Sequence, residues 1–189
     1  EVFVNTGSSS EYGFKDYAMR ETDLLEPNSY YSVAKCAQTL LCQHVANTDK
    51  RPITTFRLFS VYGPYEEPSR LLPTLIRLCL EGNDLNLVDP ETARDFVYVD
   101  DATAAFVRAA HKTCRSEPGL SINVATGNRI TLAEVARTAK EVFGLPGDAE
   151  FGSHRNRKWD LSNWYGNPAL AKAKLDWVAT TPFAQGLEL

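Results

Sequence analysis

The sequence has no run of about 18 apolar residues, so it lacks a segment long enough to cross a bilayer as a helix. Its first residues carry neither a basic cluster nor an apolar stretch, and we expect no signal peptide there. An excess of basic charge is also missing, because 20 Lys and Arg accompany 24 Asp and Glu, for a net charge of −4. These absences disfavour membrane proteins and general nucleic-acid binders.

Cysteine and histidine are scarce, with four and three residues respectively. The cysteines form no C-x-x-C pair, and the histidines stand apart from them and from one another, so we expect no metal site. Cys36, Cys42 and Cys79 fall in stretches with helical spacing. Buried, reduced thiols of a cytoplasmic protein explain them better than a disulfide framework, which a chain of this length does not need.

A glycine-rich phosphate-binding turn is absent as well, since the eleven glycines include no G-x-G. Enzymes that bind a dinucleotide on a βαβ unit normally open with a strand, such a turn and a helix. This chain begins inside an apolar strand pattern and without Met. We therefore expect it to be the C-terminal part of a longer protein.

The pattern that is present predicts an α/β fold. Residues 2–5 form a short apolar strand, followed by a hydroxyl-rich turn over 6–10. Apolar residues spaced by three and four predict a helix over 31–47, and β-branched and aromatic residues predict a strand over 53–59. Strand, helix and strand in this order are typical of a parallel sheet.

Shorter elements follow downstream. The sequence predicts helices over 71–80, from a cap at Asp100 and Asp101 to about residue 111, from a Thr131–Glu134 capping box, and over 169–175. It predicts strands over 85–88, 96–99 and 121–124.

Tyr31 and Lys35 lie one helical turn apart, so both side chains fall on one face of the first helix. A lysine ammonium beside a phenol favours the phenolate by Coulomb attraction, and such a phenol can take or give a proton at a carbon that carries a hydroxyl or a carbonyl oxygen. The pair alone fits a solvated helix face equally well.

Three stretches with polar side chains support a chemical role. Two of them follow predicted strands, and the third combines a lone arginine with a strand and a helix cap. The stretches span residues 6–13, 57–64 and 93–101, and the first two leave the carboxyl ends of neighbouring strands. Ligands of open α/β sheets bind at that edge. Each stretch alone has a structural explanation, as a serine turn, a proline turn or a salt-bridged arginine, but their order and spacing together do not.

With these motifs the chain resembles the extended short-chain dehydrogenases/reductases, in the group of NAD-dependent nucleotide-sugar epimerases and dehydratases. The catalytic Ser or Thr of that group stands four residues before the Tyr of a Tyr-Gly pair, which falls on Ser8. Its Y-x-x-x-K motif falls on Tyr31 and Lys35, its R-x-F-x-x-Y-G-P stretch on 57–64, and its R-D-F-x-x-V-x-D motif on 94–101.

The resemblance implies NAD or NADP as cofactor and a nucleoside-diphosphate sugar as substrate. Ser8, Tyr31 and Lys35 would be catalytic, with Tyr31, Lys35 and Phe59 at the nicotinamide end of the cofactor. Arg94 would bind the substrate diphosphate, and a second arginine, Arg155 or Arg157, would lie near it. The residues expected at the substrate are Ser9, Ser60, Leu72, Val88, Arg94 and Arg157.

One departure from the family pattern bears on the reaction. Related 4,6-dehydratases carry acidic residues directly after the catalytic Thr, and this chain has Ser9 and Ser10 there, with Glu11 displaced by one position. A dehydratase reaction would therefore lack the acid that protonates the 6-hydroxyl of the sugar as it is eliminated. This favours an epimerase or a 4-ketoreductase that works through a 4-keto sugar, with a 4,6-dehydratase or a non-catalytic nucleotide-sugar-binding lobe as alternatives.

The resemblance also implies the domain organisation. Residues 1–61 would form the C-terminal part of a Rossmann-type parallel sheet, and residues 62–189 mainly a smaller α+β substrate-binding lobe, from which some segments can return to the first domain. A homodimer in the cytoplasm, with no metal, is expected.

Overall fold

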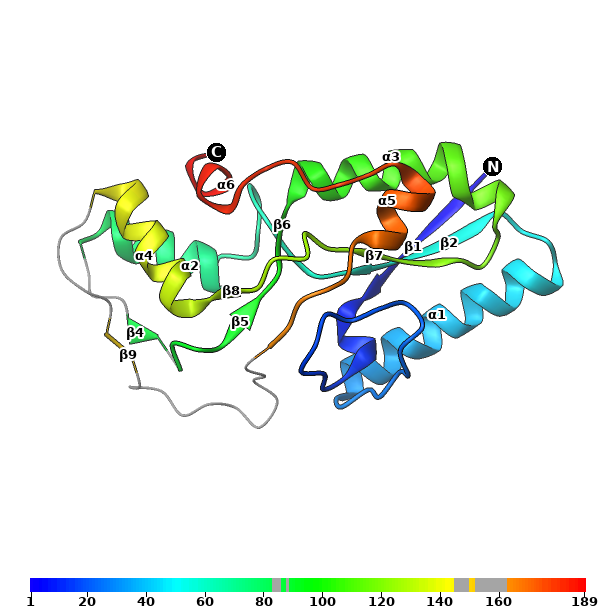
Figure 1. The fold of residues 1–189 in the computed structure, drawn as a ribbon, viewed down its shortest axis with the longest axis horizontal. Coiled ribbons are helices and arrows are strands. Elements are labelled where there is room, and N and C mark those ends of the chain that lie inside the picture. Colours follow the sequence, from blue (N-terminus) through cyan, green and yellow to red (C-terminus); the bar gives the residue numbers. More distant parts are fainter. Residues whose placement is uncertain (83–85, 88, 145–149, 152–162) are drawn as a thin grey trace.

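The computed structural model describes residues 1–82, 86–87, 89–144, 150–151 and 163–189 (Figure 1). In chain order the elements are β1 (Phe3–Ser8), a 3-10 helix (Ser9–Tyr12), α1 (Tyr30–Thr48), β2 (Ile53–Leu58), β3 (Ser60–Tyr62), α2 (Leu71–Leu80), β4 (Asn86–Leu87), β5 (Ala93–Arg94), β6 (Phe96–Tyr98), α3 (Val99–Ser116), β7 (Ser121–Val124), β8 (Ile130–Thr131), α4 (Leu132–Phe143), β9 (Glu150–Phe151), α5 (Ala169–Leu175) and α6 (Phe183–Glu188).

The central sheet is parallel, in the order β1-β2-β7. Helix α1 covers one of its faces, while α3 covers the other (Figure 1). The hydroxyl of Ser29 caps α1 by accepting a hydrogen bond from the Ser32 backbone N–H, which satisfies an amide that the first turn leaves open. The predicted α/β fold with a Rossmann-type parallel sheet is confirmed.

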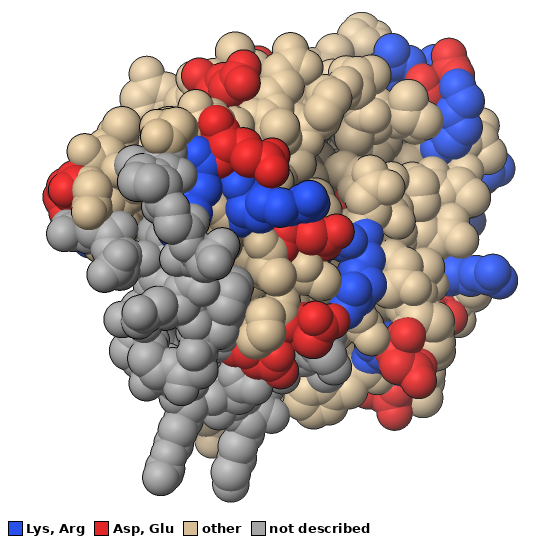
Figure 2. Space-filling model, turned by 60° about the vertical axis from the view of Figure 1, so that its left-hand side comes forward, with Lys and Arg blue, Asp and Glu red and all other residues tan. Residues whose placement is uncertain are grey.

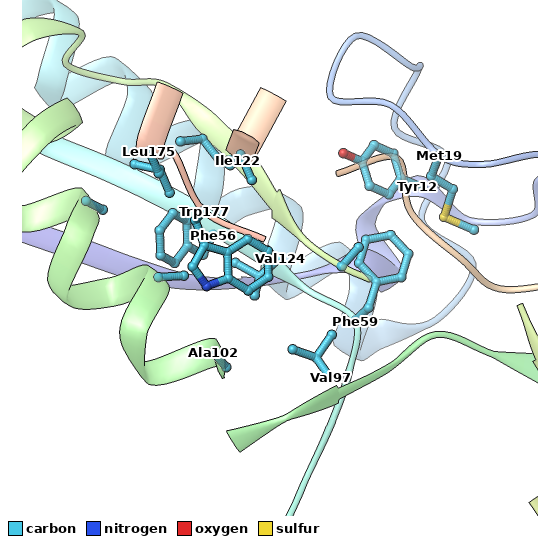
Figure 3. Close-up of a cluster of buried hydrophobic side chains, with 14 residues drawn as sticks. Tyr12, Met19, Phe56, Phe59, Val97, Ala102, Ile122, Val124, Leu175 and Trp177 are labelled. Atoms are coloured by element: carbon cyan, nitrogen blue, oxygen red, sulfur yellow. The ribbon is translucent and has the colours of Figure 1, made fainter. Parts of the chain in front are cut away.

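Two apolar cores hold the elements together. The larger one lies between the sheet and α3, where Phe56 and the almost fully buried Trp177 pack together with other apolar side chains (Figure 3). Phe106 meets Phe56 edge to face, with 4.9 Å between the ring centres. The smaller one joins α2, α4, β6 and α6 around Tyr62, whose ring contacts Phe96 and Tyr98. The parallel pair β3–β6 continues the chain from one core to the other.

The boundaries of several elements agree with the sequence pattern, and two differ. Helices α2 and α5 and strand β7 have the predicted bounds, and Thr131 and Glu134 form the predicted capping box. Strand β1 runs on through Ser8, because residues 6–8 pair in register with β2 instead of turning away. Helix α3 begins at Val99, so Asp100 and Asp101 lie in its first turn and do not cap it, and the helix reaches Ser116, beyond the predicted end near residue 111.

The surface of the described residues mixes charges of both signs. Figure 2 shows lysine and arginine side chains interspersed with aspartate and glutamate on the face drawn there. Within the described part of the chain, no helix is both long and apolar enough to span a membrane.

Candidate active site

The turn after β1 is closed by a capping box. Ser8 caps the 3-10 helix, and its hydroxyl oxygen accepts hydrogen bonds from the backbone N–H of Ser10 at 3.2 Å and the Ser10 hydroxyl at 2.9 Å. With both acceptor positions used, the hydroxyl proton of Ser8 is left to donate to another oxygen. The next turn depends on Gly13, where φ is +68° and a Cβ would collide with the Glu26 carbonyl.

The first turns of α1 lie beside this turn. The ammonium nitrogen of Lys35 donates to the backbone carbonyl of Thr6 at 2.8 Å and to Gln38 Oε1 at 3.2 Å, and it lies 5.9 Å from the centre of the Tyr31 ring. Two of the three ammonium hydrogens are thus used among the described residues, which leaves one donor for a ligand. Tyr31 is 59% exposed, so its hydroxyl is accessible from solvent.

A pocket of about 840 Å³ opens at the start of α1. Its lining combines polar groups of the turn after β1 and of the start of α1 with Arg94 and an aromatic ring from the C-terminal segment. The lining residues are Ser10, Pro27, Asn28, Ser29, Tyr30, Val33, Arg94 and Trp164. A pocket of this size, with aromatic walls and a few convergent polar groups, is suited to a small organic ligand.

Trp164 lines this pocket, although no motif in the sequence singles it out. Its indole N–H donates to the hydroxyl of Ser9 at 2.8 Å, which ties the C-terminal segment to the turn after β1. No spacing in the sequence signals this contact, because it joins residues from opposite ends of the chain.

A smaller pocket of about 120 Å³ adjoins Arg94. Ser60 and Leu72, both expected at the substrate, line it together with Arg94 and Arg70. The structure thus brings three of the predicted substrate residues together. Val88 and Arg157 lie outside the described residues.

Asp95 holds the strand that carries Arg94. Its buried carboxylate accepts hydrogen bonds from the backbone N–H groups of Thr126, Gly127 and Gly166 and from the Thr126 hydroxyl, at 2.7–3.2 Å. Burial raises the pKa of Asp95 above its ordinary value, although these hydrogen bonds oppose the shift. Asp95 therefore joins three segments next to the pocket.

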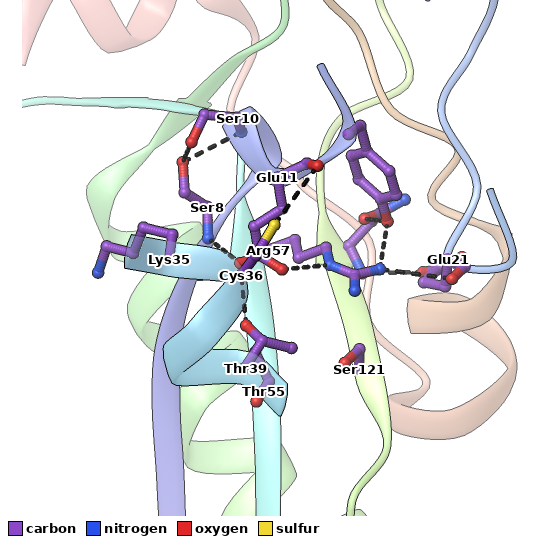
Figure 4. Close-up of polar contacts among 12 residues, drawn as sticks. Ser8, Ser10, Glu11, Glu21, Lys35, Cys36, Thr39, Thr55, Arg57 and Ser121 are labelled. Carbon is purple, nitrogen blue, oxygen red and sulfur yellow. Dashed lines mark hydrogen bonds and ion pairs between the residues drawn. The ribbon is translucent and has the colours of Figure 1, made fainter. Parts of the chain in front are cut away.

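Glu11 does not face the pocket. It is completely buried, and its carboxylate forms an ion pair with Arg57, with 2.9 Å between Oε2 and Nε (Figure 4). Arg57 in turn donates to the hydroxyl of Tyr12 at 3.0 Å. A carboxylate engaged in this way is not available as an acid for a bound sugar.

Some described residues fit the nicotinamide end of a dinucleotide, whereas the sequence contains no G-x-G pattern for its pyrophosphate. Lys35 offers its remaining donor at the carboxyl edge of β1, where a ribose hydroxyl would be held, and Tyr31 stands one turn before it. Phe59 lies deeper, 5% exposed in the larger core (Figure 3). A Cβ at position 166 would collide with its ring, so the close approach requires the glycine found there.

Comparison with known proteins identifies the family. The model of the NAD dependent epimerase/dehydratase family matches residues 1–125. The chain belongs to this family. Solved relatives include the UDP-glucuronic acid 4-epimerase of Bacillus cereus in complex with UDP-glucuronic acid and NAD, which is 27% identical with a TM-score of 0.89, over 100% of this chain and 59% of that chain.

Two further relatives show the range of proteins that the chain resembles. A trifunctional UDP-glucose 4,6-dehydratase/UDP-4-keto-6-deoxy-D-glucose 3,5-epimerase/UDP-4-keto-L-rhamnose-reductase of Arabidopsis thaliana is 26% identical over 98% of this chain and 28% of its own length. MoeE5, solved with UDP-glucuronic acid and NAD, is 30% identical with a TM-score of 0.88, over 98% of this chain and 62% of that chain. The chain thus spans between about a quarter and two thirds of the length of these epimerase/dehydratase relatives.

Proposed function

We propose that the chain forms the catalytic and sugar-binding part of an NAD(P)-dependent nucleoside-diphosphate-sugar epimerase or 4-ketoreductase. The observation that carries the proposal is the meeting of two motifs at one sheet edge. Lys35 bonds to the strand that ends in Ser8, and Tyr31 stands one turn before Lys35 on α1. The pocket beside them contains Arg94, a cation suited to a diphosphate.

Each catalytic side chain then has one task at the sugar. The phenolate oxygen of Tyr31 takes the proton of a sugar hydroxyl while the carbon that bears this hydroxyl is oxidised to a ketone. Tyr31 returns the proton when the ketone is reduced. Ser8 donates its free hydroxyl proton to the same oxygen, and the Lys35 ammonium lies 5.9 Å from the centre of the Tyr31 ring. NAD or NADP, when bound, supplies the hydride acceptor and donor.

Substrate recognition is proposed at the two pockets that Arg94 joins. Its guanidinium would bind the diphosphate, Ser60 would contact the sugar, and Leu72 would contribute apolar surface. Ser9 is 5% exposed and is not among the described residues that line these pockets, so its contact with the sugar remains a prediction from the sequence. UDP-sugars are bound by the solved relatives, which supports this substrate class. Val88 and Arg157 remain predictions from the sequence.

A 4,6-dehydratase is disfavoured by the same geometry. Serines occupy positions 9 and 10, and the nearest glutamate is buried against Arg57. A non-catalytic sugar-nucleotide-binding lobe is the second candidate, favoured by the missing glycine-rich turn. Turnover separates the two, because a binding lobe would hold UDP-sugars without converting them.

The test is an assay of the product of the full reading frame with UDP-glucose, UDP-glucuronic acid and their keto derivatives. Nuclear magnetic resonance would follow inversion at C4 or reduction of the keto sugar, with deuterium at C4 reporting hydride transfer. Inversion with retained deuterium supports an epimerase, and reduction of only the keto sugars supports a reductase. Loss of the 6-hydroxyl, or binding without any conversion, would contradict the proposal.

We also propose a cytoplasmic homodimer. Helix α1 exposes an apolar face with Val33, Leu40 and Leu41, the two leucines being 56% and 63% exposed, and a second copy of the chain would cover it. The free thiols Cys36 and Cys79 suit a reducing compartment. Leu40→Glu with Leu41→Glu should yield a monomer in sedimentation, and an unchanged dimer would place the interface elsewhere.

A further inference from the structure

We propose that Glu11 is a positioning residue that fixes Ser8 relative to the helix of Tyr31. This inference rests on the proposed function, in which Ser8 and Tyr31 act on the same sugar oxygen. Glu11 itself does not touch the substrate, since its side chain is completely buried beneath the turn.

The carboxylate of Glu11 joins three elements (Figure 4). Its Oε1 accepts the backbone N–H of Ser8 at 2.9 Å and the hydroxyl of Thr39 at 3.0 Å. Its Oε2 accepts Nε of Arg57 at 2.9 Å. Ser8 ends β1, Thr39 lies on α1 two turns after Tyr31, and Arg57 lies on β2, so one side chain connects the catalytic turn to the catalytic helix and to the neighbouring strand.

The surroundings of Arg57 keep the carboxylate in place. The guanidinium lies 4.8 Å from the centre of the Tyr12 ring and donates to the Tyr12 hydroxyl and to the Glu21 carbonyl. The Tyr12 hydroxyl donates onward to Asn123 at 2.7 Å. Each group in this hydrogen-bond network has a fixed partner, so the Glu11 carboxylate is held in one position.

A buried ion pair is a poor source of net stability, because desolvation of both charges offsets their attraction. An apolar pair of similar volume would fill the same space. What an apolar side chain at position 11 cannot provide is an acceptor for the Ser8 N–H. That amide would then be unsatisfied in a half-buried turn, and the backbone that carries the Ser8 hydroxyl would lose its anchor.

The geometric effect should appear in turnover rather than in binding. A displaced hydroxyl fails to meet the reacting oxygen, and misplacement by about 1 Å can cost on the order of 10²-fold in rate. Substrate affinity depends on Arg94 and the pocket walls, which Glu11 does not contact. The expected signature is a lower kcat at unchanged KM.

Two double variants of the full-length enzyme test whether the hydrogen-bond acceptor for the Ser8 N–H is what matters, separately from the ion pair. Glu11→Val with Arg57→Met and Glu11→Gln with Arg57→Met both remove the ion pair without leaving a buried charge, and only the second keeps an oxygen for the Ser8 N–H. We expect kcat to fall by about 10- to 100-fold in the valine variant and to recover in the glutamine variant, with KM unchanged in both. Equal kcat values in the two variants would overturn the inference.

A second measurement holds even if the double variants fail to fold. Amide hydrogen exchange should be slow at Ser8 in the wild-type enzyme and faster in Glu11→Asp, which keeps the charge opposite Arg57 but shortens the side chain. Fast exchange at Ser8 in the wild type, or wild-type kcat in Glu11→Asp, overturns the inference. Ser8→Ala separates the two proposals. Wild-type kcat in Ser8→Ala would overturn the proposed catalytic role of Ser8. A low kcat in Ser8→Ala together with a normal kcat in the Glu11→Val, Arg57→Met variant would overturn only the role of Glu11.

Discussion

The indole nitrogen of Trp164 donates a hydrogen bond to the hydroxyl of Ser9, 155 positions earlier in the chain. The ring thereby becomes a wall of the pocket that also contains Arg94. Trp164→Ala should raise KM for the nucleotide sugar by about 10-fold, the value of one ring contact and one hydrogen bond. Trp164→Phe keeps an aromatic ring without the indole N–H, and its KM should lie between those of the wild type and Trp164→Ala. An unchanged KM in Trp164→Ala would contradict a place for the ring at the substrate.

Removal of the Tyr31 hydroxyl should abolish most of the turnover. Tyr31→Phe is expected to lower kcat by about 10²–10⁴-fold, the usual loss for a missing general acid or base. Tyr17→Phe is a matched control, because Tyr17 is also exposed but lies away from the pocket. Rapid-quench assays with saturating substrate measure the effect, and near-normal turnover in Tyr31→Phe would rule out the proton transfer.

Loss of the Arg94 guanidinium should act mainly on affinity, because the diphosphate that it is proposed to bind does not react. Arg94→Ala is expected to raise KM with a smaller change in kcat, and Arg94→Lys to recover part of the loss, since lysine keeps the charge but not the planar fork. Arg77→Ala, which removes an exposed arginine paired with Glu81, controls for net charge. A fall in kcat alone would show that Arg94 does not bind the phosphates.

The stability of the fold should depend on pH through Asp101. Burial opposes its ionisation, but hydrogen bonds from the Thr181 backbone and the Thr180 hydroxyl outweigh that effect and lower the pKa of Asp101 below its ordinary value of 3.8. A lowered pKa in the folded state means that the carboxylate stabilises the protein above pH 3.8, and that this contribution disappears as the pH falls through the folded-state value.

Asp101→Asn should therefore destabilise the protein at neutral pH by about 1 kcal/mol or more, with a difference from wild type that shrinks in acid. The exposed Asp100 beside it offers a control, and Asp100→Asn should change little at any pH. Thermal unfolding across the acid range measures both variants. A difference for Asp101→Asn that grows as the pH falls would reverse the assigned sign.

The chain of residues 1–189 alone should show no measurable binding of NAD. The pyrophosphate of a dinucleotide is normally held by backbone N–H groups at a glycine-rich helix start, and the sequence contains no such turn. Lys35 and Tyr31 would contact only the nicotinamide end. Isothermal titration decides the point, since micromolar binding by this chain would mean that other residues hold the phosphates.

Much of the fold was visible in the sequence because its elements carry local patterns. Apolar spacing predicted α1, and the bounds of α2 and α5 follow directly from the first and last apolar positions. The family, too, could be read from motifs that are contiguous in the chain. Strands such as β5 and β8 could not, because two residues carry no periodicity and their pairing depends on the approach of a distant segment.

The site was predictable only in part, for a related reason. Ser8, Tyr31 and Lys35 belong to short motifs, so their positions could be named, and their catalytic roles remain predictions. The partners of Glu11 are 28 and 46 positions away, on a helix and a strand, and nothing local distinguishes a buried glutamate from an exposed one. The bond between Trp164 and Ser9 likewise exists only once both ends of the chain have folded.

The order of strands in the central sheet has a consequence for how the protein acquires its structure. Strand β2 pairs on one side with β1 and on the other with β7, and the whole segment 59–120 lies between β2 and β7 in the chain. Closing so long a loop costs entropy before the pairing offsets it, so the last strand of the sheet is expected to join late and slowly. Until it does, the edge of β2 stays open to pairing with other chains. A nascent or refolding chain should therefore be most prone to aggregation in that interval, and dilute, cool refolding conditions should raise the yield.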